Sequence, residues 1–315
     1  MRVRILGSRN RPGVQDAIER LLPEISACVT SVVVDWIEDG TSPEGFSSAS
    51  TDLVMVFGGD GSILRAIQQM GVQQLPIMAV NLGRLGFLAN VSLDEAVELL
   101  ERLRRQTARL GKNWPEKLLE KETRGKSRRQ KPQVTISEHL LLDCQVTHRT
   151  AGRRVETHSA LVVNEVAIQN ASFRIMEVRL FADDEFVTTY SCDGLILSTP
   201  VGSTAHSLSA GGPILRQDLD DVVISPIAPH TLTYRPVVDS ARRVYRLEAT
   251  CRDDAPGVVV VDGSVLCQLR AGDSVQVTAS DTRFRMLNPP GYSYYTNLQR
   301  KLGWSGHAYF NGEER

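Results

Sequence analysis

The stretch Leu53–Gln69, LVMVFGGDGSILRAIQQ, joins an apolar run to a helical pattern through a glycine loop. The run Leu53–Phe57 is uninterrupted, which is typical of a strand that is buried on both faces. After the glycines, apolar residues recur at helical spacing and would share one face: Ile63, Leu64, Ile67 and Met70. The stretch therefore predicts a strand, a glycine loop and a helix, the repeating unit of a parallel α/β sheet.

Asp60 is an unexpected residue in this loop. Glycines let backbone N–H groups approach a phosphate, and a helix start favours anions, whereas a carboxylate about 4 Å from a phosphate charge is repelled by about 1 kcal/mol in water. One interpretation makes Asp60 the N-cap of the helix. The other makes it a general base that takes a proton from a hydroxyl attacking the phosphate, which requires it to lie close by. The loop matches neither a Walker motif nor G-x-G-x-x-G.

The segments on either side of this unit extend the α/β pattern. VRIL and LPIMAVNLG indicate strands, and PGVQDAIERLLPEI and DEAVELLERLRRQ indicate helices. From Val134 onward short β patterns with turns between them dominate, which indicates a β-sandwich. We therefore predict an α/β nucleotide-binding domain with a parallel sheet over 1–132 and a β-sandwich over 133–287. The tail 288–315 is expected to return to the first domain.

Composition excludes several classes of protein. The chain has 315 residues, 42% of them hydrophobic, and a formal net charge of −1, so no bulk attraction to nucleic acid or acidic membranes is expected. It contains no apolar run of about 18 residues and no signal-peptide core. Its five cysteines are scattered and never spaced C-x-x-C, which indicates a reduced, cytoplasmic protein.

Lys121–Lys131 holds six basic residues and one acidic residue. We interpret it as a solvated linker outside the chemistry, with attraction of phosphates as the alternative.

Two further stretches carry polar residues in unusual places. In NLGRLGFLANV, Phe87 either offers a flat face to a ring or is a core residue. In VVNEVAI, Asn164 and Glu165 interrupt an apolar run, although successive strand residues face opposite ways. Either the strand ends or bulges there, or one of the two points inward and needs a hydrogen-bond partner. That partner is a ligand or a structural network.

The segment Ser191–Leu215, SCDGLILSTPVGSTAHSLSAGGPIL, is rich in small hydroxyl side chains. GLILS predicts a strand, Thr199-Pro200 starts a helix and Gly211-Gly212-Pro213 ends it. Its hydroxyls suit the polar edges of a nucleotide, and a Ser/Thr-rich turn is the alternative. In VVVVDGSVLCQL, Asp262-Gly263 predicts a type I′ hairpin turn with a structural role.

Several of these stretches together resemble the NAD kinase family: GGDGSILRA, NLGRLGFLA, NEVAI, DGLILSTPVGSTAHSLSAGGPI, PHTLTYRPVV and YSYYTNLQRKLGW. The resemblance covers nearly the whole chain. It implies phosphorylation of the 2′-hydroxyl of the adenosine ribose of NAD, with ATP as donor and Mg²⁺ or another divalent cation as cofactor. It implies the same two-domain fold, and we expect a homo-oligomer, either a dimer or a tetramer.

The resemblance also implies site residues. Asp60 would be the catalytic base and Gly61 its loop partner, while Asn164 and Glu165 would contact the adenosine. The other positions that match nucleotide-binding residues are Arg65, Phe87, Arg174, Asp193, Thr204, Ala205, His206, Ser207, Leu208, Ser209 and Ala228. Many members have Tyr at the position of His206 and Gln at that of Ser264. The metal ligands stay unknown.

Two rival hypotheses remain at this point. A lipid kinase also carries GGDG but would leave the Asn164–Glu165 pair and the serine-rich segment unexplained. A non-catalytic NAD(H) sensor would be expected to lack the base, yet Asp60 is present. The sequence leaves open whether NADH is used and whether polyphosphate replaces ATP.

Overall fold

The structure is a computed structural model that describes residues 1–39, 46–83, 86–111, 113–119, 133–149, 155–170, 175–251 and 257–304. Its backbone contacts divide the chain into two units, 1–138 together with 285–315, and 139–284. Each unit has its own hydrophobic core. The predicted borders at residues 132 and 287 stay predictions. In the part of the chain that is described, no helix combines the length and the apolar character needed to cross a membrane.

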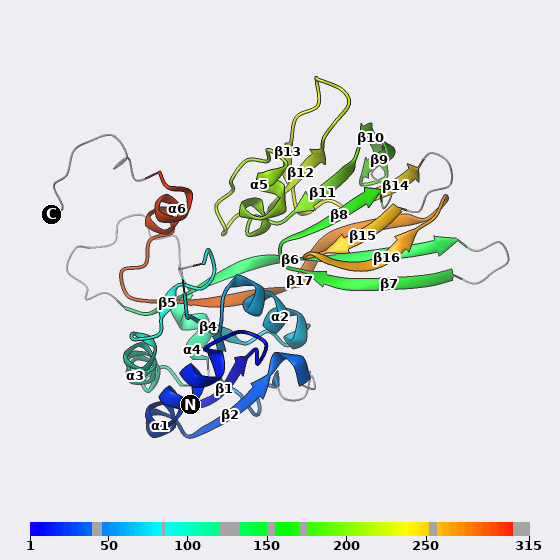
Figure 1. Cartoon of the computed structure of the whole chain (residues 1–315). Helices are drawn as coiled ribbons and strands as arrows, with labels where there is room; N and C mark the ends of the chain where they lie inside the picture. Colours follow the sequence, from blue (N-terminus) through cyan, green and yellow to red (C-terminus); the bar gives the residue numbers. More distant parts are fainter. Residues whose placement is uncertain are drawn as a thin grey trace. The chain divides into compact units, whose positions relative to one another are not determined.

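The first unit is the predicted α/β domain with a parallel sheet. Its strands are β1 (Arg2–Gly7), β2 (Ser31–Trp36), β3 (Leu53–Phe57), β4 (Pro76–Asn81) and the short β5 (Val91–Ser92). Its helices are α1 (Val14–Cys28), η1 (Ile37–Asp39), α2 (Asp60–Met70), α3 (Ala96–Thr107), α4 (Trp114–Leu118) and α6 (Tyr294–Leu302). The strands are parallel in the order β2-β1-β3-β4, and β5 pairs with β4 (Figure 1).

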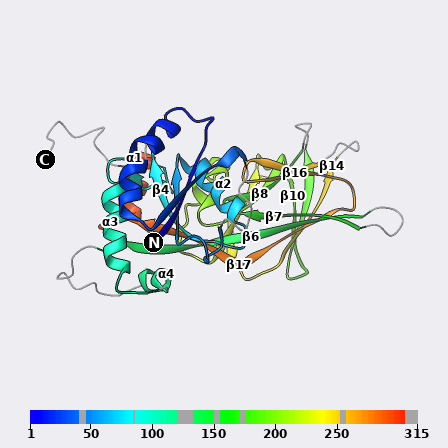
Figure 2. The ribbon, with the colours of Figure 1, turned by 90° about the horizontal axis from the view of Figure 1, so that it is seen from below.

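Strand β3 is apolar at every position because its side chains alternate between two faces that are both covered. Leu53, Met55 and Phe57 lie in one core cluster with residues of α1 and α3, two helices that pack against each other (Figure 2). Val54 and Val56 point to the opposite face, and all five residues of β3 are buried. A strand covered on both faces needs no polar residue, as is usual for parallel sheets.

The C-terminal tail belongs to this first unit, as predicted. Asn90 donates a hydrogen bond from its side-chain amide to the carbonyl of Leu287 and another to Oδ1 of Asn288, at 3.1 and 2.9 Å. Helix α6 starts at an N-cap, Ser293, whose hydroxyl accepts the Thr296 N–H. The tail is thereby fixed to the segment that follows β4.

The second unit is a sandwich of antiparallel strands. One layer has the order β13-β12-β11-β8-β15-β16. Its strands are β8 (Glu165–Asn170), β11 (Gly194–Ser198), β12 (Asp221–Ile227), β13 (Val237–Ser240), β15 (Gly257–Val261) and β16 (Ser264–Leu269). The other layer contains β10-β9-β14-β17, together with the hairpin β6-β7. Its strands are β6 (Thr135–Arg149), β7 (Val155–Val162), β9 (Met176–Ala182), β10 (Glu185–Cys192), β14 (Tyr245–Cys251) and β17 (Ser274–Asn288). The first residues of β6 and the last residues of β17 belong to the first unit.

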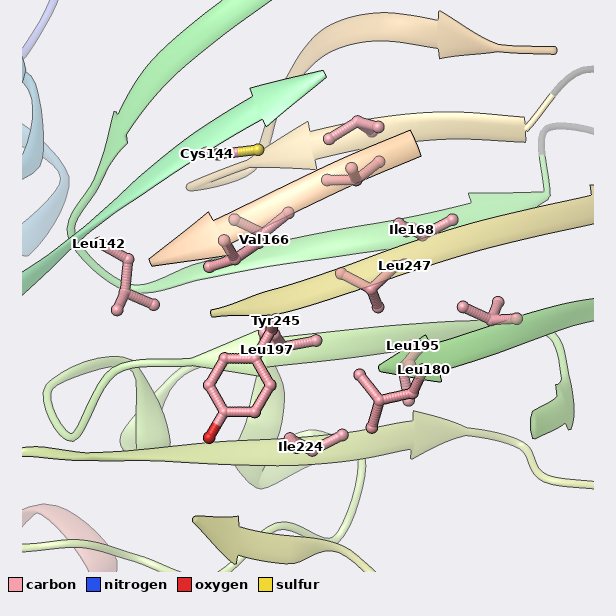
Figure 3. Packing of buried hydrophobic residues seen from close by; sticks show 14 of the residues in the cluster. Leu142, Cys144, Val166, Ile168, Leu180, Leu195, Leu197, Ile224, Tyr245 and Leu247 are labelled. Carbon is pink, nitrogen blue, oxygen red and sulfur yellow. The ribbon is translucent and has the colours of Figure 1, made fainter. Parts of the chain in front are cut away.

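Side chains from the two layers meet in one buried cluster. Figure 3 shows Leu195 and Leu197 of β11 and Ile224 of β12 beside Leu180 of β9 and Tyr245 of β14. All of these residues are buried. The predicted architecture, a parallel α/β domain followed by a β-sandwich, is therefore confirmed.

Two elements were not predicted, and one local prediction needs correction. The strand β2 was not predicted, because its sequence SVVVDW is only partly buried and lacks a clear alternation. Helix α4, which buries Trp114 and Leu118, was not predicted either. The single helix expected between Thr199 and Gly211 is two short pieces, a 3₁₀ turn over Gly202–Thr204 and α5 (His206–Ser209). The basic run Lys121–Lys131 lies outside the described residues.

Candidate functional site

The predicted residues of the first unit lie at the carboxyl ends of adjacent strands. Gly7 at the end of β1 is in register with Phe57 at the end of β3, and Phe57 is in register with Val80 of β4. The loops after these three strands therefore leave the sheet at the same edge. In open α/β sheets this edge is where ligands bind.

Asp60 is the first residue of α2, but its carboxylate does not cap that helix. The N-cap position is Gly59, and no side chain caps the helix start. Instead, Oδ2 of Asp60 accepts the Phe87 N–H at 2.8 Å, and Oδ1 accepts the N–H groups of Leu88 and Ala89 at 3.1 Å each. The N-cap interpretation is therefore wrong. The carboxylate joins the loop after β3 to the loop after β4, and about one of its roughly four acceptor positions is left for another partner.

Gly86 has to be a glycine because of this arrangement. A Cβ atom built on Gly86 would lie 1.9 Å from Oδ1 of Asp60. The carbonyls of Gly86 and Phe87 accept hydrogen bonds from the side-chain amide of Asn297 in α6, at 3.4 and 3.3 Å. The C-terminal helix thus holds the loop whose amides hold Asp60. The glycine stretch around Gly86 was noticed in the sequence, but no pattern pointed to Asn297.

The other predicted residues of this unit lie on α2 or in the loop after β4. Phe87 is half-buried, and the Lys301 ammonium nitrogen lies 6.0 Å from its ring centroid. Arg65 is exposed on α2 and, with Ile37, Gln68 and Gln69, lines an open depression of about 420 Å³. Gly61 is exposed, and nothing lies within 4 Å of a Cβ atom built on it.

The open space beside Gly61 gives a prediction that separates folding from function. Gly61→Ala should leave the free energy of unfolding unchanged or raise it by about 0.5 to 1 kcal/mol, because alanine favours a helix over glycine. If the nucleotide occupies that space, the added methyl group should lower kcat/KM by about tenfold or more. Thermal unfolding and steady-state kinetics on the same preparation measure both. Normal kinetics would show that no ligand approaches Gly61.

In the second unit, the Asn164–Glu165 pair lies where one strand ends and the next begins. Strand β7 ends at Val162 and β8 begins at Glu165, so a strand end is observed. Glu165 is also buried, as the other alternative required of one of the two residues. The N–H groups of Val163, Asn164 and Glu165 donate to the Asp262 carboxylate at 2.9, 2.7 and 3.1 Å. This fixes the turn that carries the pair.

Asp262 and Gly263 form the predicted hairpin turn between β15 and β16. Their φ values of 47° and 80° are both positive, as a type I′ turn requires. The turn itself was predicted, but the use of the Asp262 carboxylate was not. Its three donors lie almost a hundred residues earlier in the chain, and no local pattern connects the two segments.

The Glu165 carboxyl group is buried and incompletely paired. Burial raises its pKa to about 7, and the negative charge of Asp262 adds to the effect, while the His206 backbone N–H opposes it. Its Oε2 atom is buried without a hydrogen-bond partner in the described structure. A buried polar atom without a partner is costly, so Glu165 stays a candidate for binding a ligand.

The raised pKa predicts how stability depends on pH. Between pH 4.5 and about 7 the folded chain retains a proton on Glu165 that the unfolded chain releases, so this group lowers stability as pH rises through that interval. Glu165→Gln should therefore unfold like the unmodified chain near pH 4.5 and be more stable above pH 7, by at most about 3 kcal/mol. Calorimetry at both pH values measures the difference. The exposed Glu185→Gln is the control, and a pH-independent effect would contradict the assignment.

The serine-rich segment turns most of its hydroxyls inward. Ser203 donates to the Pro200 carbonyl at 2.6 Å and accepts the Leu215 N–H. Ser207 is buried, and its hydroxyl lies 3.0 Å from that of Ser225. The groups left at the surface are the exposed His206 and Ser209 and the half-buried Thr204, Ala205 and Leu208.

Asp193 and Ala228 lie away from Glu165 within this unit. Ser198 at the end of β11 is in register with Glu165, whereas Asp193 precedes the other end of that strand. Five strand residues separate the two positions by roughly 16 Å. Asp193 is half-exposed, 3.7 Å from the His230 ring, and Ala228 has a positive φ of 43°. The second unit therefore holds two groups of predicted residues. Arg174 lies outside the described residues.

Within the described ranges, no three His, Cys, Asp or Glu side chains are grouped so that they could hold a metal ion. Mg²⁺ commonly binds through one or two carboxylates together with substrate phosphates and keeps several waters. Such an ion needs no cage of protein ligands.

Comparison with known proteins identifies the family of this chain. Residues 15–108 match the ATP-NAD kinase N-terminal domain, and residues 163–288 match the ATP-NAD kinase C-terminal domain. The chain is 41% identical over 306 residues to the NAD kinase of Rhodopirellula baltica, covering 97% of this chain and 87% of the relative. It is 32% identical over 322 residues to the NAD kinase of Gemmatimonas aurantiaca, covering 99% of each.

Two solved structures share the fold. One is yeast NADH kinase complexed with NADH, with a TM-score of 0.75 and 20% identity, covering 100% of this chain and 90% of the other. The second is an NAD kinase from Archaeoglobus fulgidus in complex with ATP, with a TM-score of 0.65 and 24% identity, covering 97% and 100%. With both domains matched and relatives similar over nearly its full length, this chain belongs to the ATP-NAD kinase family.

Proposed function

We propose that this protein transfers the γ-phosphoryl group of ATP to the 2′-hydroxyl of the adenosine ribose of NAD, giving NADP and ADP. The observation that carries the proposal is the Asp60 carboxylate, held by three amides at the carboxyl edge of the sheet beside a glycine loop. The identity of the acceptor, NAD, is inferred from relatives that are named NAD kinase.

In the proposed transfer, Asp60 is the general base. Asp60 accepts the proton of the 2′-hydroxyl as the ribose O2′ forms its bond to the γ-phosphorus. The bond from that phosphorus to the β–γ bridging oxygen breaks, and ADP leaves with the electron pair. Because its orientation is fixed by three hydrogen bonds, Asp60 needs no reorganisation during transfer. When bound to ATP, a divalent cation neutralises phosphate charge.

Glu165 supports recognition of the acceptor. Its unpaired Oε2 can accept a hydrogen bond from a donor group of the adenosine, and a polar site rejects ligands that lack the matching group. Asn164, on the same turn, is half-buried, and in this proposal it contacts the same ligand. Glu165→Ala should therefore raise KM for NAD more than KM for ATP.

A matrix of donors and acceptors tests this proposal. Purified protein should form NADP from NAD when ATP and Mg²⁺ are supplied. NADH is the second acceptor to compare, because one of the solved structures with this fold is yeast NADH kinase complexed with NADH. Polyphosphate and other nucleoside triphosphates complete the donor side. Failure to phosphorylate NAD with any donor would refute the proposal and favour a non-catalytic sensor. Family membership leaves the lipid-kinase hypothesis without support.

We also propose that the protein acts in the cytoplasm as a dimer or tetramer. The scattered cysteines suit a reducing compartment, and Cys28, Cys144, Cys192 and Cys267 are free thiols. Light scattering with size-exclusion chromatography measures the oligomeric state.

A further inference from the structure

The loop after β1, Ser8–Gly13 with the sequence SRNRPG, lies at the same edge of the sheet as Asp60 and is held in a defined shape. The Ser8 hydroxyl and the Arg9 N–H both donate to the carboxylate of Glu38. Burial opposes ionisation of Glu38, but these hydrogen bonds outweigh it and lower its pKa. The Arg9 guanidinium lies 4.9 Å from the centre of the Trp36 ring. The two contacts fix the loop to the last residue of β2, Trp36, and to the 3₁₀ turn that follows it.

This loop places the Arg11 side chain directly on the glycine loop. A Cβ atom built on Gly59 would lie 2.7 Å from one terminal nitrogen of Arg11, 3.1 Å from the other and 3.3 Å from the guanidinium carbon. One built on Gly58 would lie 3.8 Å from the first nitrogen. The guanidinium therefore rests against the two glycines that precede Asp60, and glycine is what permits this approach.

The positive charge of Arg11 has no protein partner in the described structure. Its side chain is exposed and forms no ion pair with any residue that the structure describes, whereas Arg2 and Arg4 of the preceding strand pair with Asp52 and Asp35. Asp60 directly follows Gly59 in the chain. Both oxygens of its carboxylate accept hydrogen bonds from backbone N–H groups of the loop after β4. A guanidinium is thus held beside the catalytic loop with its hydrogen-bond donors available.

We propose that Arg11 binds the phosphate groups of ATP and stabilises the charge that develops on the transferred phosphoryl group. The identity of the donor rests on the proposed function. A guanidinium presents paired donors that match two phosphate oxygens, and phosphoryl transfer depends mainly on positioning and charge stabilisation of this kind. Arg11 precedes residue 15, where the match to the N-terminal family domain begins.

Three full-length variants test the proposal. Arg11→Ala removes the guanidinium, Arg11→Lys keeps the charge without the fork, and Arg20→Ala removes an exposed arginine of α1 as the matched control. We expect Arg11→Ala to lower kcat/KM for ATP by about 10²-fold or more, with KM for NAD changed less than about threefold. Arg11→Lys should recover part of the loss because a phosphate still meets a positive charge. Arg20→Ala should match the unmodified protein.

Calorimetric titration with MgATP makes the outcome independent of turnover. Arg11→Ala should weaken ATP binding by about tenfold or more while its thermal unfolding matches that of the unmodified protein. ATP affinity and kcat/KM equal to those of Arg20→Ala would overturn the role of Arg11. If the unmodified protein binds MgATP but forms no NADP, the proposed function fails, and the affinity of Arg11→Ala still decides the inference. Equal losses for ATP and NAD would show a general disturbance of the site and would also overturn it.

Discussion

Asp60→Asn is expected to lower kcat by about 10²-fold or more while NAD still binds. The substitution removes the group proposed to take the proton from the ribose hydroxyl, and a general base contributes typically 10²–10⁴-fold. Steady-state kinetics with NAD and ATP measure the effect, and NAD titration shows whether binding survives. Asp94→Asn, at a fully exposed carboxylate of the same unit, is the control.

The structure adds a second consequence of this substitution. The backbone N–H groups of Phe87, Leu88 and Ala89 now donate to the Asp60 carboxylate. The NH₂ group of an asparagine is itself a donor, so at least one of these N–H groups would lose its acceptor. Leaving a buried donor unsatisfied costs about 1–3 kcal/mol, so Asp60→Asn should also lower the free energy of unfolding by about that amount. Normal turnover in a variant with this stability loss would contradict the role as base and leave Asp60 as an anchor of the loop.

Gly86→Ala is expected to lower kcat by a comparable factor without removing any catalytic group. The added Cβ would lie 1.9 Å from Oδ1 of Asp60, so either the carboxylate or the loop has to move. Because the carboxylate is held by three amides, its displacement breaks hydrogen bonds and misplaces the base. A misplacement of about 1 Å can cost about 10²-fold in rate. Kinetics and thermal unfolding of the variant measure both effects.

Gly83→Ala is the matched control for this experiment. Gly83 belongs to the same stretch after β4, and nothing lies within 4 Å of a Cβ atom built on it. It should therefore retain the activity of the unmodified protein. If Gly86→Ala and Gly83→Ala behave alike, the contact between Gly86 and Asp60 does not position the base.

The fold could be predicted where local pattern and burial agree. Strand β3 was found because both of its faces are covered, so its sequence is apolar throughout. The segment after β11 was predicted as one helix because its ends carry the expected signals, yet side chains compete for its backbone. Thr199 accepts the Gly202 N–H and donates to the carbonyl of Val163. Such side-chain hydrogen bonds favour turns over a continuous helix.

The candidate site could be predicted as a set of residue types but not as a set of contacts. Asp60, Asn164 and Glu165 stood out because polar groups occupy a glycine loop and an apolar run. Their partners could not be found in the same way, because Asp60 binds amides 27 to 29 residues further along the chain. Arg11 was passed over because an exposed arginine in a turn is ordinary until its position on the glycine loop is known.

The proposed transfer can be tested directly by following the phosphoryl group itself. The unmodified protein is incubated with NAD and with ATP that carries a radioactive γ-phosphate, and the labelled product is separated and identified. We expect one labelled dinucleotide, with the phosphate on the 2′-oxygen of the adenosine ribose, that an NADP-specific dehydrogenase accepts, and almost none from Asp60→Asn. Label released only as inorganic phosphate, or attached at any other position of NAD, would contradict it.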